Sequence, residues 1–440
     1  MHPKESGISR RQLLQRSAVA AAGLSVAGAL AGCENTTTPI GAADAEGDVS
    51  SAAKKFVVAK PLGPAGLPLP RPDNSITWAV TDDNKPIADG VKPEPGPLRI
   101  YNYADYVDPE TVKKFQQKFG AKVQVATYNS SDEAIAKIAS GQVSFDLIMG
   151  LTGSNMVDLI ARQLLKPLNH SYLPNLEKNI WPELSDPFYD RGGVYTVPYV
   201  VWMDGIGWRN DQLKEDVANM DVPWDIFWQA QAYRGKVGIL DDRRDALSMP
   251  MQRDGMRRDV RADLNTEDKG VVDKAQRDLS DLSRICNPKV TITDYQTLPE
   301  GKTVLHHSWS GDLLSGAFYY MPKGVKPDVL SFWGPQQNGV VQNDFLCVGK
   351  AAKSPVLAHQ FINFFLDEKN AYNNFVNFVG YTPPQKNIDA PALIKRGLIP
   401  KSLQDAVVRP DQFAANQELL QLSVEGQRIW DDAWSKFKAG

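Results

Sequence analysis

The chain has 440 residues, 42% of them hydrophobic, so it is too long for a disulfide mini-protein and too apolar for a disordered chain. Its 49 Lys and Arg against 52 Asp and Glu give a net charge of −3, which argues against the basic stripe that nucleic-acid binding needs. Three cysteines are too few for a disulfide framework or a four-cysteine zinc site. By length alone, we expect about two to three domains.

The first 33 residues are predicted to be an export signal rather than part of the fold. Arg10 and Arg11 precede an apolar run over 18–31 that is too short and too rich in Gly and Ala to span a membrane. The twin arginine resembles the Tat class of signals, and the run ends in a Leu-Ala-Gly-Cys string that resembles a bacterial lipobox. This resemblance implies cleavage before Cys33 and acylation of its thiol. The alternative is a chance Ala-rich start followed by an ordinary cysteine.

Loss of that signal would take the net charge from −3 to −6, which suits a cationic ligand. The next segment, 34–97, is rich in Pro and Gly and is predicted to be a tether. Its Trp78 and Val80 indicate that part of it docks on the folded chain. We expect Cys286 and Cys347 not to pair, because Cys347 lies in an apolar strand-like run where a buried free cysteine is ordinary.

From residue 98 onward, strand and helix patterns alternate. Strands are predicted at 98–102, 122–126 and 145–149. Helices are predicted at 108–120 and at 154–162, and a further helix is predicted to begin at a Ser131-Asp132 cap. Three such units predict a parallel α/β sheet with right-handed crossovers. Later patterns predict a strand at 236–240, long polar helices from about 243 to 285, a helix capped by Ser354-Pro355, and a C-terminal helix with Trp430, Trp434 and Phe437 on one face.

Motifs for common catalytic chemistry are missing from the sequence. It has no Gly-x-Ser-x-Gly elbow, no His-Glu-x-x-His string and no Walker A loop. His306 and His307 are adjacent, so on a strand they would face opposite ways and could not chelate one ion together. We therefore expect no enzyme activity, no cofactor and no metal site.

Acidic and aromatic residues stand together at several predicted strand ends. They are Tyr103, Asp105 and Tyr106 after the first strand, Asp242 and Asp245 after 237–240, Trp309 after 303–305, and Asp344 within an apolar run. Ligands of open α/β sheets bind beyond the carboxyl ends of strands. Acids with rings at several such ends would make a cation-selective site.

In the order and spacing of these strings, the chain resembles the spermidine/putrescine-binding lipoproteins of bacterial polyamine ABC importers. The resemblance covers about 98–440 and rests on the strings at 100–107, 145–148, 197–199, 205–207, 241–245, 309–311, 343–344 and 379–384. It implies ligand-binding roles for Tyr103, Asp105, Tyr106, Asp242, Asp245, Trp309, Asp344 and Tyr381. The sequence departs from the pattern at Gln342, where the family has Trp, at Ala104, which replaces a hydroxyl, and at 152–155, where a Tyr is missing.

Each expected site residue also has an ordinary interpretation. Tyr103 and Tyr106 could be core aromatics, Trp309 could be a core residue, and the two acids at 242 and 245 could form a solvated charge run with their arginine neighbours. For Asp344, a role in ligand binding is the favoured interpretation, because a buried acid needs a partner. Asp204 and Asp312 are treated as ordinary acids.

The resemblance implies an α/β periplasmic-binding-protein fold of type II, with two domains joined by a hinge and a ligand cleft between them. Domain 1 is expected to comprise 98–203 plus 342–389, and domain 2 to comprise 204–341 plus 390–440. The chain would cross between them near 202–207, 337–341 and 388–394.

The implied function is the substrate-binding component of an ABC importer, which captures spermidine or putrescine and delivers it to a membrane permease. The protein would be an exported monomer anchored by lipid at Cys33 to the outer face of the cell membrane. One alternative is a binding protein of the same fold for another small cationic or amino-acid-like solute, including a metal. A ferric site would use neighbouring tyrosines, but Tyr319 and Tyr320 would face opposite ways on a strand. The other alternative is an exported enzyme or sensor on this fold.

Overall fold

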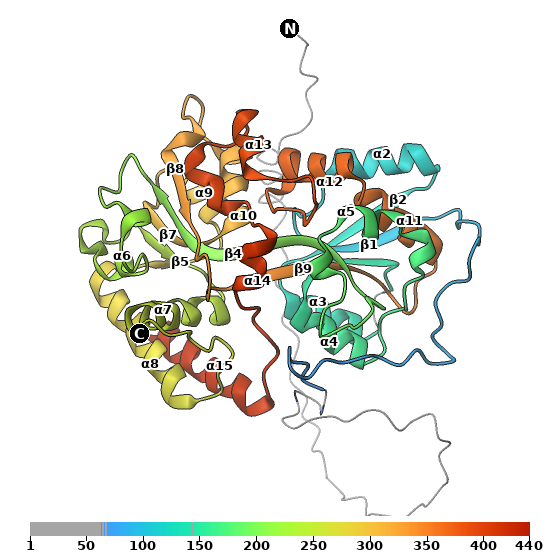
Figure 1. Cartoon of the computed structure of the whole chain (residues 1–440), viewed down its shortest axis with the longest axis horizontal. Helices are drawn as coiled ribbons and strands as arrows, with labels where there is room; N and C mark the ends of the chain where they lie inside the picture. The colour runs from blue at the N-terminus through green and yellow to red at the C-terminus, as the bar shows by residue number, and fades with distance from the viewer. Residues whose placement is uncertain (1–62, 64–65, 67, 142–143) are drawn as a thin grey trace, which may run out of the picture. The chain divides into compact units, whose positions relative to one another are not determined.

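The computed structural model describes residues 63, 66, 68–141 and 144–440 (Figure 1). The expected export signal, its Cys33 and most of the expected tether lie outside the described residues. A nine-stranded sheet organises the described chain, in the order β2-β1-β3-β9-β4-β7-β5-β6, with β8 also paired to β4. The strands are β1 (Leu98–Tyr103), β2 (Val123–Tyr128), β3 (Leu147–Thr152), β4 (Val197–Arg209), β5 (Val237–Ile239), β6 (Lys289–Val290), β7 (Leu305–Trp309), β8 (Leu330–Trp333) and β9 (Val341–Val348).

Helices connect and cover these strands. The longer ones are α2 (Pro109–Phe119), α3 (Ser131–Ala139), α4 (Gly153–Ala161), α7 (Arg243–Arg258), α8 (Lys269–Cys286), α11 (Pro355–Phe365) and α15 (Val424–Ala439). The shorter ones are α5 (Pro174–Asn179), α6 (Asp225–Trp228), α9 (Asp294–Thr297), α10 (Ser310–Ser315), α12 (Glu368–Asn374), α13 (Ala390–Lys395) and α14 (Pro410–Ala415).

The first strands and helices confirm the predicted parallel α/β pattern. Strand β1 pairs in parallel with both β2 and β3. Helix α2 begins after Asp108, whose carboxylate accepts two backbone N–H bonds, and ends at Gly120 with a left-handed φ of 68°. Helix α3 is capped by Ser130 and not by the expected Ser131-Asp132, because the Ser130 hydroxyl is the group that accepts the N–H of Glu133.

Two faces of this part of the sheet bury different residues, as the two-residue period of a strand requires. Leu98 and Ile100 of β1 join a core with Phe115 of α2, whereas Tyr101 joins a second core with Ile138 of α3. Figure 1 shows α2 and α11 on one side of β1–β3 and α3 and α4 on the other. These four predicted helices therefore cover the two faces of this part of the sheet.

A third core lies around β5 and the polar helices predicted from 243 to 285, which are α7 and α8. Helix α15 packs beside them (Figure 1) and buries Trp430 and Phe437. Trp434 is only partly buried, but its ring stacks on that of Phe437 with centroids 5.2 Å apart. The predicted aromatic face of the C-terminal helix is thus confirmed.

Strand β4 connects the two parts of the sheet. Its residues up to Met203 pair with β9, and from Asp204 onward they pair with β7 and then β8. All of these pairings are antiparallel, and every residue of β4 is buried. The partner changes at the boundary expected between 203 and 204. The division into two domains itself stays a prediction.

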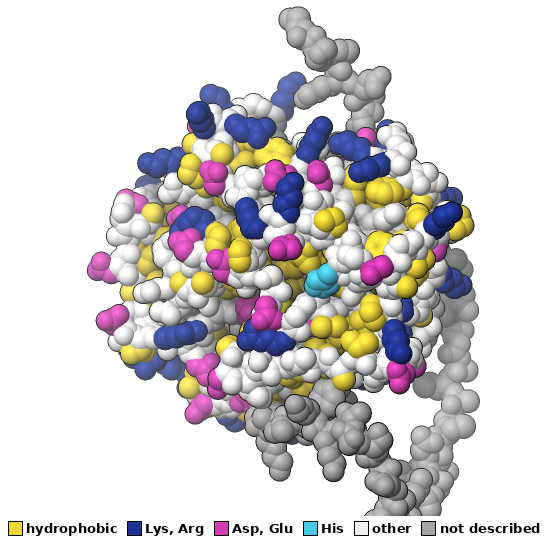
Figure 2. Space-filling model, turned by 45° about the vertical axis from the view of Figure 1, so that its right-hand side comes forward, with side chains coloured by type: hydrophobic (Ala, Val, Ile, Leu, Met, Phe, Trp, Pro, Cys, Tyr) yellow, Lys and Arg dark blue, Asp and Glu magenta, His cyan; other side chains and the backbone are white. Residues whose placement is uncertain are grey.

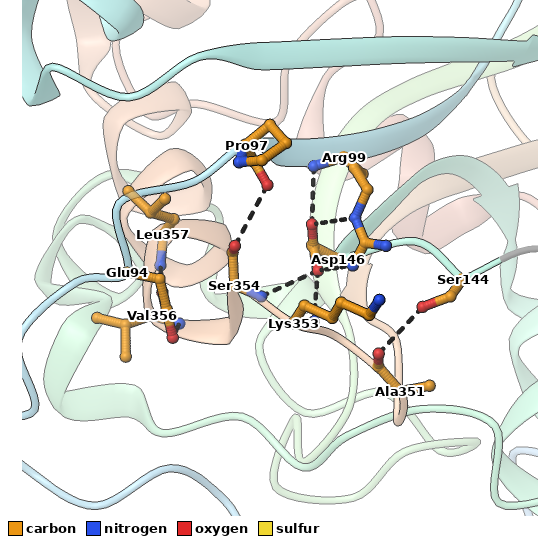
Figure 3. A network of polar contacts seen from close by, with 10 residues as sticks. All are labelled: Glu94, Pro97, Arg99, Ser144, Asp146, Ala351, Lys353, Ser354, Val356 and Leu357. Carbon is orange, nitrogen blue, oxygen red and sulfur yellow. Dashed lines mark hydrogen bonds and ion pairs between the residues drawn. The ribbon is translucent and has the colours of Figure 1, made fainter.

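Asp146, immediately before β3, ties three segments together (Figure 3). Its fully buried carboxylate accepts two bonds from the Arg99 guanidinium, at 2.8 and 3.0 Å, and one from the Arg99 backbone. It also accepts the backbone N–H groups of Lys353 and Ser354 ahead of α11. Helix α11 starts at the predicted Ser354-Pro355, but the acceptor for its first N–H groups is the carboxylate of Glu94.

The end of the Pro/Gly-rich segment packs on the folded chain. Trp78 is 8% exposed, and its indole N–H donates to the backbone oxygen of Tyr189 at 2.7 Å. The expected docking of part of this segment is thus confirmed through Trp78, whereas Val80 is 47% exposed. The two cysteines, Cys286 and Cys347, are both buried with free thiols and belong to different cores.

Candidate functional site

Asp344 lies within β9, and its carboxylate is shielded from water. The residue is 5% exposed, and the Tyr106 hydroxyl donates to its Oδ2 at 2.6 Å. The indole N–H of Trp202 donates to its Oδ1 at 3.2 Å. Burial raises the pKa of Asp344 to about 6, and the hydrogen bonds from the two neutral donors offset only part of that rise. We refer to Asp344 as the first acid pole.

Tyrosine rings surround this pole. The Tyr106 ring lies edge-on to Tyr199 and Tyr381, with centroids 5.5 and 5.3 Å away, and 6.0 Å from Tyr103. The Tyr199 hydroxyl donates to the backbone oxygen of Tyr106, and the Tyr103 hydroxyl donates to that of Asn129. Burial raises the pKa of Tyr103 to about 12 and that of Tyr106 well above its usual range, so both phenols stay protonated near neutral pH.

A second group of acids lies at the start of α7. Asp242 is the helix N-cap, and its Oδ1 accepts the backbone N–H groups of Arg244 and Asp245. Asp245 is 3% exposed, and its Oδ2 accepts the indole N–H of Trp309 at 3.0 Å. Burial, together with the neighbouring charges of Asp204 and Asp242, raises the pKa of Asp245 well above its usual range. We refer to Asp242 and Asp245 as the second acid pole.

Two tryptophans connect the poles. Trp202 of β4 and Trp309 at the end of β7 have ring centroids 5.6 Å apart, with an angle of 59° between their planes. Trp202 donates to Asp344 and Trp309 donates to Asp245. Residues from four elements, β9, β4, β7 and α7, thus form a continuous path from acid to indole to indole to acid. Such a path matches a ligand with cationic groups at its ends and methylenes between them.

The late tyrosine, Tyr381, packs between the two groups. Its hydroxyl donates to Oδ1 of Asp312 at 2.9 Å, and its ring faces Gly311 so closely that a Cβ there would lie 2.4 Å from ring atoms. Position 311 therefore requires glycine. Asp105 occupies the turn between β1 and Tyr106 with a left-handed φ of 57°, a conformation that Asp tolerates better than most residues.

The structure brings the expected residues other than Asp105 into these two groups, but their roles in binding stay a prediction. Tyr103, Tyr106 and Tyr381 form one aromatic group with Asp344, and Trp309 joins the acids of the second pole. The two acids at 242 and 245 are not a solvated charge run, because one caps a helix and the other is buried.

Four neighbours were not expected as site residues: Tyr199, Trp202, Asp204 and Asp312. Trp202 is the most informative, because β4 pairs it directly with Gln342, the position where the resemblance expects a tryptophan. Residues opposite each other on antiparallel strands share a face, so an indole still reaches Asp344, but from the adjacent strand. Only the strand register reveals that Trp202 of β4 takes the place of the tryptophan expected at position 342. The acid that follows two residues later, Asp204, could have been found as a same-face neighbour of Trp202 on one strand.

Two surface hollows lie elsewhere on the described chain. A cavity of about 280 Å³ is lined by residues of α12 and α13, among them Glu368 and Arg396, and one of about 200 Å³ is lined by Glu183, Arg191 and Glu418 among others. Neither lining includes an expected ligand-binding residue. Figure 2 shows acidic and basic side chains interspersed over the visible face. Asp344 and Asp245 are 5% and 3% exposed, so we assign the site from these buried polar groups rather than from a hollow.

Two further observations limit the kind of site. Among the residues that the structure describes, no three His, Cys, Asp or Glu side chains are grouped so as to hold a metal ion. In the same part of the chain, no helix combines the length and apolar character that crossing a bilayer would require.

The mixed sheet, with two α/β parts connected through a shared strand and acids and rings gathered at the crossing, defines the class of bacterial solute-binding proteins. The sequence model of the bacterial extracellular solute-binding protein family matches residues 110–400. The chain belongs to this family, and the expected type II periplasmic-binding-protein fold is confirmed.

Named relatives are similar over most of their length. The spermidine/putrescine-binding periplasmic protein 1 of Haemophilus influenzae is 26% identical over 71% of this chain and 80% of its own. The putrescine/cadaverine-binding protein of Pseudomonas aeruginosa is 25% identical over 78% of this chain and 93% of its own. The solved spermidine/putrescine ABC transporter substrate-binding protein of Streptococcus pneumoniae superposes with a TM-score of 0.62 at 23% identity, covering 78% of this chain and 98% of that one.

Proposed function

We propose that the protein is the substrate-binding component of an ABC importer and that it captures a polyamine at the two acid poles. The observation that carries the proposal is the path from Asp344 through Trp202 and Trp309 to Asp245, in which neither buried acid forms an ion pair with a basic side chain of the described residues. The similarity to polyamine-binding relatives supports the same ligand class.

A polyamine meets the physical requirements of this path. Burying an ammonium group is costly unless a carboxylate pairs with it, and the same holds for a buried carboxylate without a cation. Aromatic faces cover the methylenes and attract each cation by roughly 0.5–2 kcal/mol per ring. The two poles then neutralise the ends of the ligand, while the indole pair and the tyrosines cover its length.

The proposed cycle needs opening and closing. Asp344, Tyr106 and Asp245 are each less than a tenth exposed, so the ligand enters only when the two expected domains separate. Strand β4 crosses between them at 203–204 and would form part of the hinge. The closed, liganded form is the state that the membrane permease would recognise.

The remaining assignments belong to the same proposal. The protein acts as a monomer, without a cofactor and without catalytic activity, on the outer side of the cell membrane. Acylation of Cys33 holds it there. A solute-binding protein for another small cation or an amino-acid-like solute is the second candidate. The names of two relatives support this second candidate, because they include cadaverine and agmatine beside putrescine.

Titration calorimetry of the purified chain against putrescine, spermidine, spermine, agmatine and a set of amino acids tests the proposal. We expect binding of at least one polyamine and none of neutral amino acids, because only a ligand with two or more cationic groups satisfies both poles. Binding of a neutral amino acid and of no polyamine would contradict the function.

A further inference from the structure

Asp204 of β4 is buried with one carboxylate oxygen unsatisfied. The residue is 0% exposed, and its Oδ2 lies 3.2 Å from Nε2 of His307. Within the described residues, its Oδ1 has no hydrogen-bond partner. A buried polar atom of this kind requires an explanation, and an unoccupied contact to a ligand is one.

The strand register places Asp204 beside the second acid pole. It pairs directly with Trp309 on β7, so the two side chains share a face of the sheet. The Trp309 indole donates to Asp245, whose own Oδ1 also has no hydrogen-bond partner among the described residues. Two buried acids, each with one oxygen that has no hydrogen-bond partner in the described part of the chain, are therefore both neighbours of Trp309, Asp204 opposite it on β4 and Asp245 at its indole N–H.

The arginines closest in sequence form no ion pair with these acids, although the charge of Arg244 offsets part of the rise in the pKa of Asp245. The Arg244 guanidinium donates to the backbone oxygens of residues 420 and 264 and to Asn265, and it stacks 4.4 Å from the Trp430 ring. Arg243 pairs with Asp431 at 3.1 Å. Burial lowers the pKa of His307 to about 3, so this imidazole is neutral.

The first pole can bind fewer cationic nitrogens than the second. There, both oxygens of Asp344 already accept hydrogen bonds, from Tyr106 and Trp202, so one ammonium group completes its surroundings. A diamine supplies one cationic nitrogen to each pole. With a diamine, Asp204 would then remain a buried acid without a cationic partner, and its Oδ1 would stay without a hydrogen bond from the described residues.

We propose that Asp204 is a specificity-determining acid that binds a second cationic nitrogen at the second pole, so that the site prefers a triamine over a diamine. This inference rests on the proposed polyamine function and adds the number of charged nitrogens to it. Asp204 acts together with Asp245, and both acids adjoin Trp309.

The electrostatics of the unliganded protein agree with this assignment. Burial, and then the charge of Asp242, raises the pKa of Asp204 well above its usual range. Asp245 faces the same group from α7, His307 faces it from β7, and Asp294 of α9 acts on His307. A cationic nitrogen that binds between these carboxyls favours their charged forms, so binding releases protons.

The decisive experiment compares spermidine, a triamine, with putrescine, a diamine, on the parent chain and on Asp204→Asn by calorimetry. We expect the variant to bind spermidine about ten- to a hundredfold more weakly, the usual effect of losing a hydrogen bond to a charged group. Putrescine affinity should change less than about threefold. Asp241→Asn is the matched control, because it removes the same charge at an exposed position that pairs with Lys438, and it should change neither affinity.

Other outcomes separate this inference from the function beneath it. A parent chain that binds no polyamine contradicts the proposed function. A parent that binds spermidine, with an Asp204→Asn variant that binds both ligands as the parent does or loses both equally, contradicts the role of Asp204. A second measurement needs no variant: titrations of the parent in buffers of different ionisation enthalpy count the protons released. Equal release for spermidine and putrescine at neutral pH would also overturn the inference.

Discussion

Two buried aspartates, Asp146 and Asp344, show how partners rather than burial decide the role of an acid. Asp146 accepts five hydrogen bonds, two of them from the Arg99 guanidinium, and these hold its pKa below the usual range despite the cost of burial. Asp344 accepts only a phenol and an indole, and burial raises its pKa to about 6. The first carboxylate is satisfied by the fold, whereas the second still needs a cation.

The Asp344→Asn variant should lose affinity for the polyamine by about two to four decades, because removal of one partner of a buried ion pair costs roughly 3–5 kcal/mol. Its melting temperature without ligand should be equal to or above that of the parent, since the variant no longer buries a carboxyl without a cation. Calorimetry and melting curves measure both, with Asp241→Asn as the exposed control. A loss below about threefold, the size expected for an exposed pair, in protein that melts normally would contradict the assignment.

Affinity should also depend on pH through Asp344. A bound ammonium group favours the carboxylate and lowers its pKa from about 6, so binding below that pH must release a proton. We therefore expect affinity to fall about tenfold per pH unit below about 6 from this group alone. The sign for stability is opposite: the raised pKa favours the folded, unliganded state at low pH, and that contribution is lost as pH rises through 6.

Dissociation constants at a series of pH values from 5 to 8 measure this dependence. The Asp344→Asn variant should lose the part of the change of affinity with pH that comes from this carboxyl group. A parent with the same affinity at pH 5 and pH 8 would show that no buried carboxyl ionises on binding.

At the scale of elements, local patterns predicted most helices and the parallel strands, because caps and periodicity act within one element. Asp108 and Gly120 mark both ends of α2 as expected. These local patterns do not predict which strands pair when the strands are far apart in the sequence. The exchange of Gln342 for Trp202 at the first pole depends on the register of β4 against β9, about 140 residues apart in the sequence. The enclosed position of Asp204 depends on β7 in the same way.

The Asp146 contacts join three such segments, and their loss should destabilise the fold. Asp146→Ala should lower the free energy of unfolding by about 3 kcal/mol, the lower end for a buried pair because the Arg99 side chain is 22% exposed. The pKa of Asp146 is lowered in the folded state, so its stabilisation is present above its unfolded pKa and is lost as pH falls through the folded value.

Urea unfolding at pH 7 and near pH 3 measures this effect, and the difference between parent and variant should be smaller in acid. Asp82→Ala, at an exposed position, is the control. A change below about 1 kcal/mol at pH 7 would show that the other contacts of this region suffice without the carboxylate.

At the scale of the whole molecule, one strand serves both folding and function. Strand β4 pairs with β9 through residue 203 and with β7 and β8 after it, and it also carries Trp202 and Asp204 on one face. A ligand that binds both acid poles therefore lies across the crossing point, so its binding energy can favour the closed arrangement of the two expected domains. Capture and closure would then be one event.

Delivery to a permease requires the protein to stay near the membrane, and we expect Cys33 to hold it there. Acyl chains on this thiol add about 0.8 kcal/mol of membrane affinity for each buried methylene, and two or more chains anchor a protein stably. In fractionated cells, the parent should therefore sediment with membranes and Cys33→Ala should appear in the soluble exported fraction. Thr36→Ala, which leaves the Leu-Ala-Gly-Cys string intact, should behave as the parent. Retention of Cys33→Ala on membranes to the same extent as the parent would exclude this thiol as the anchor.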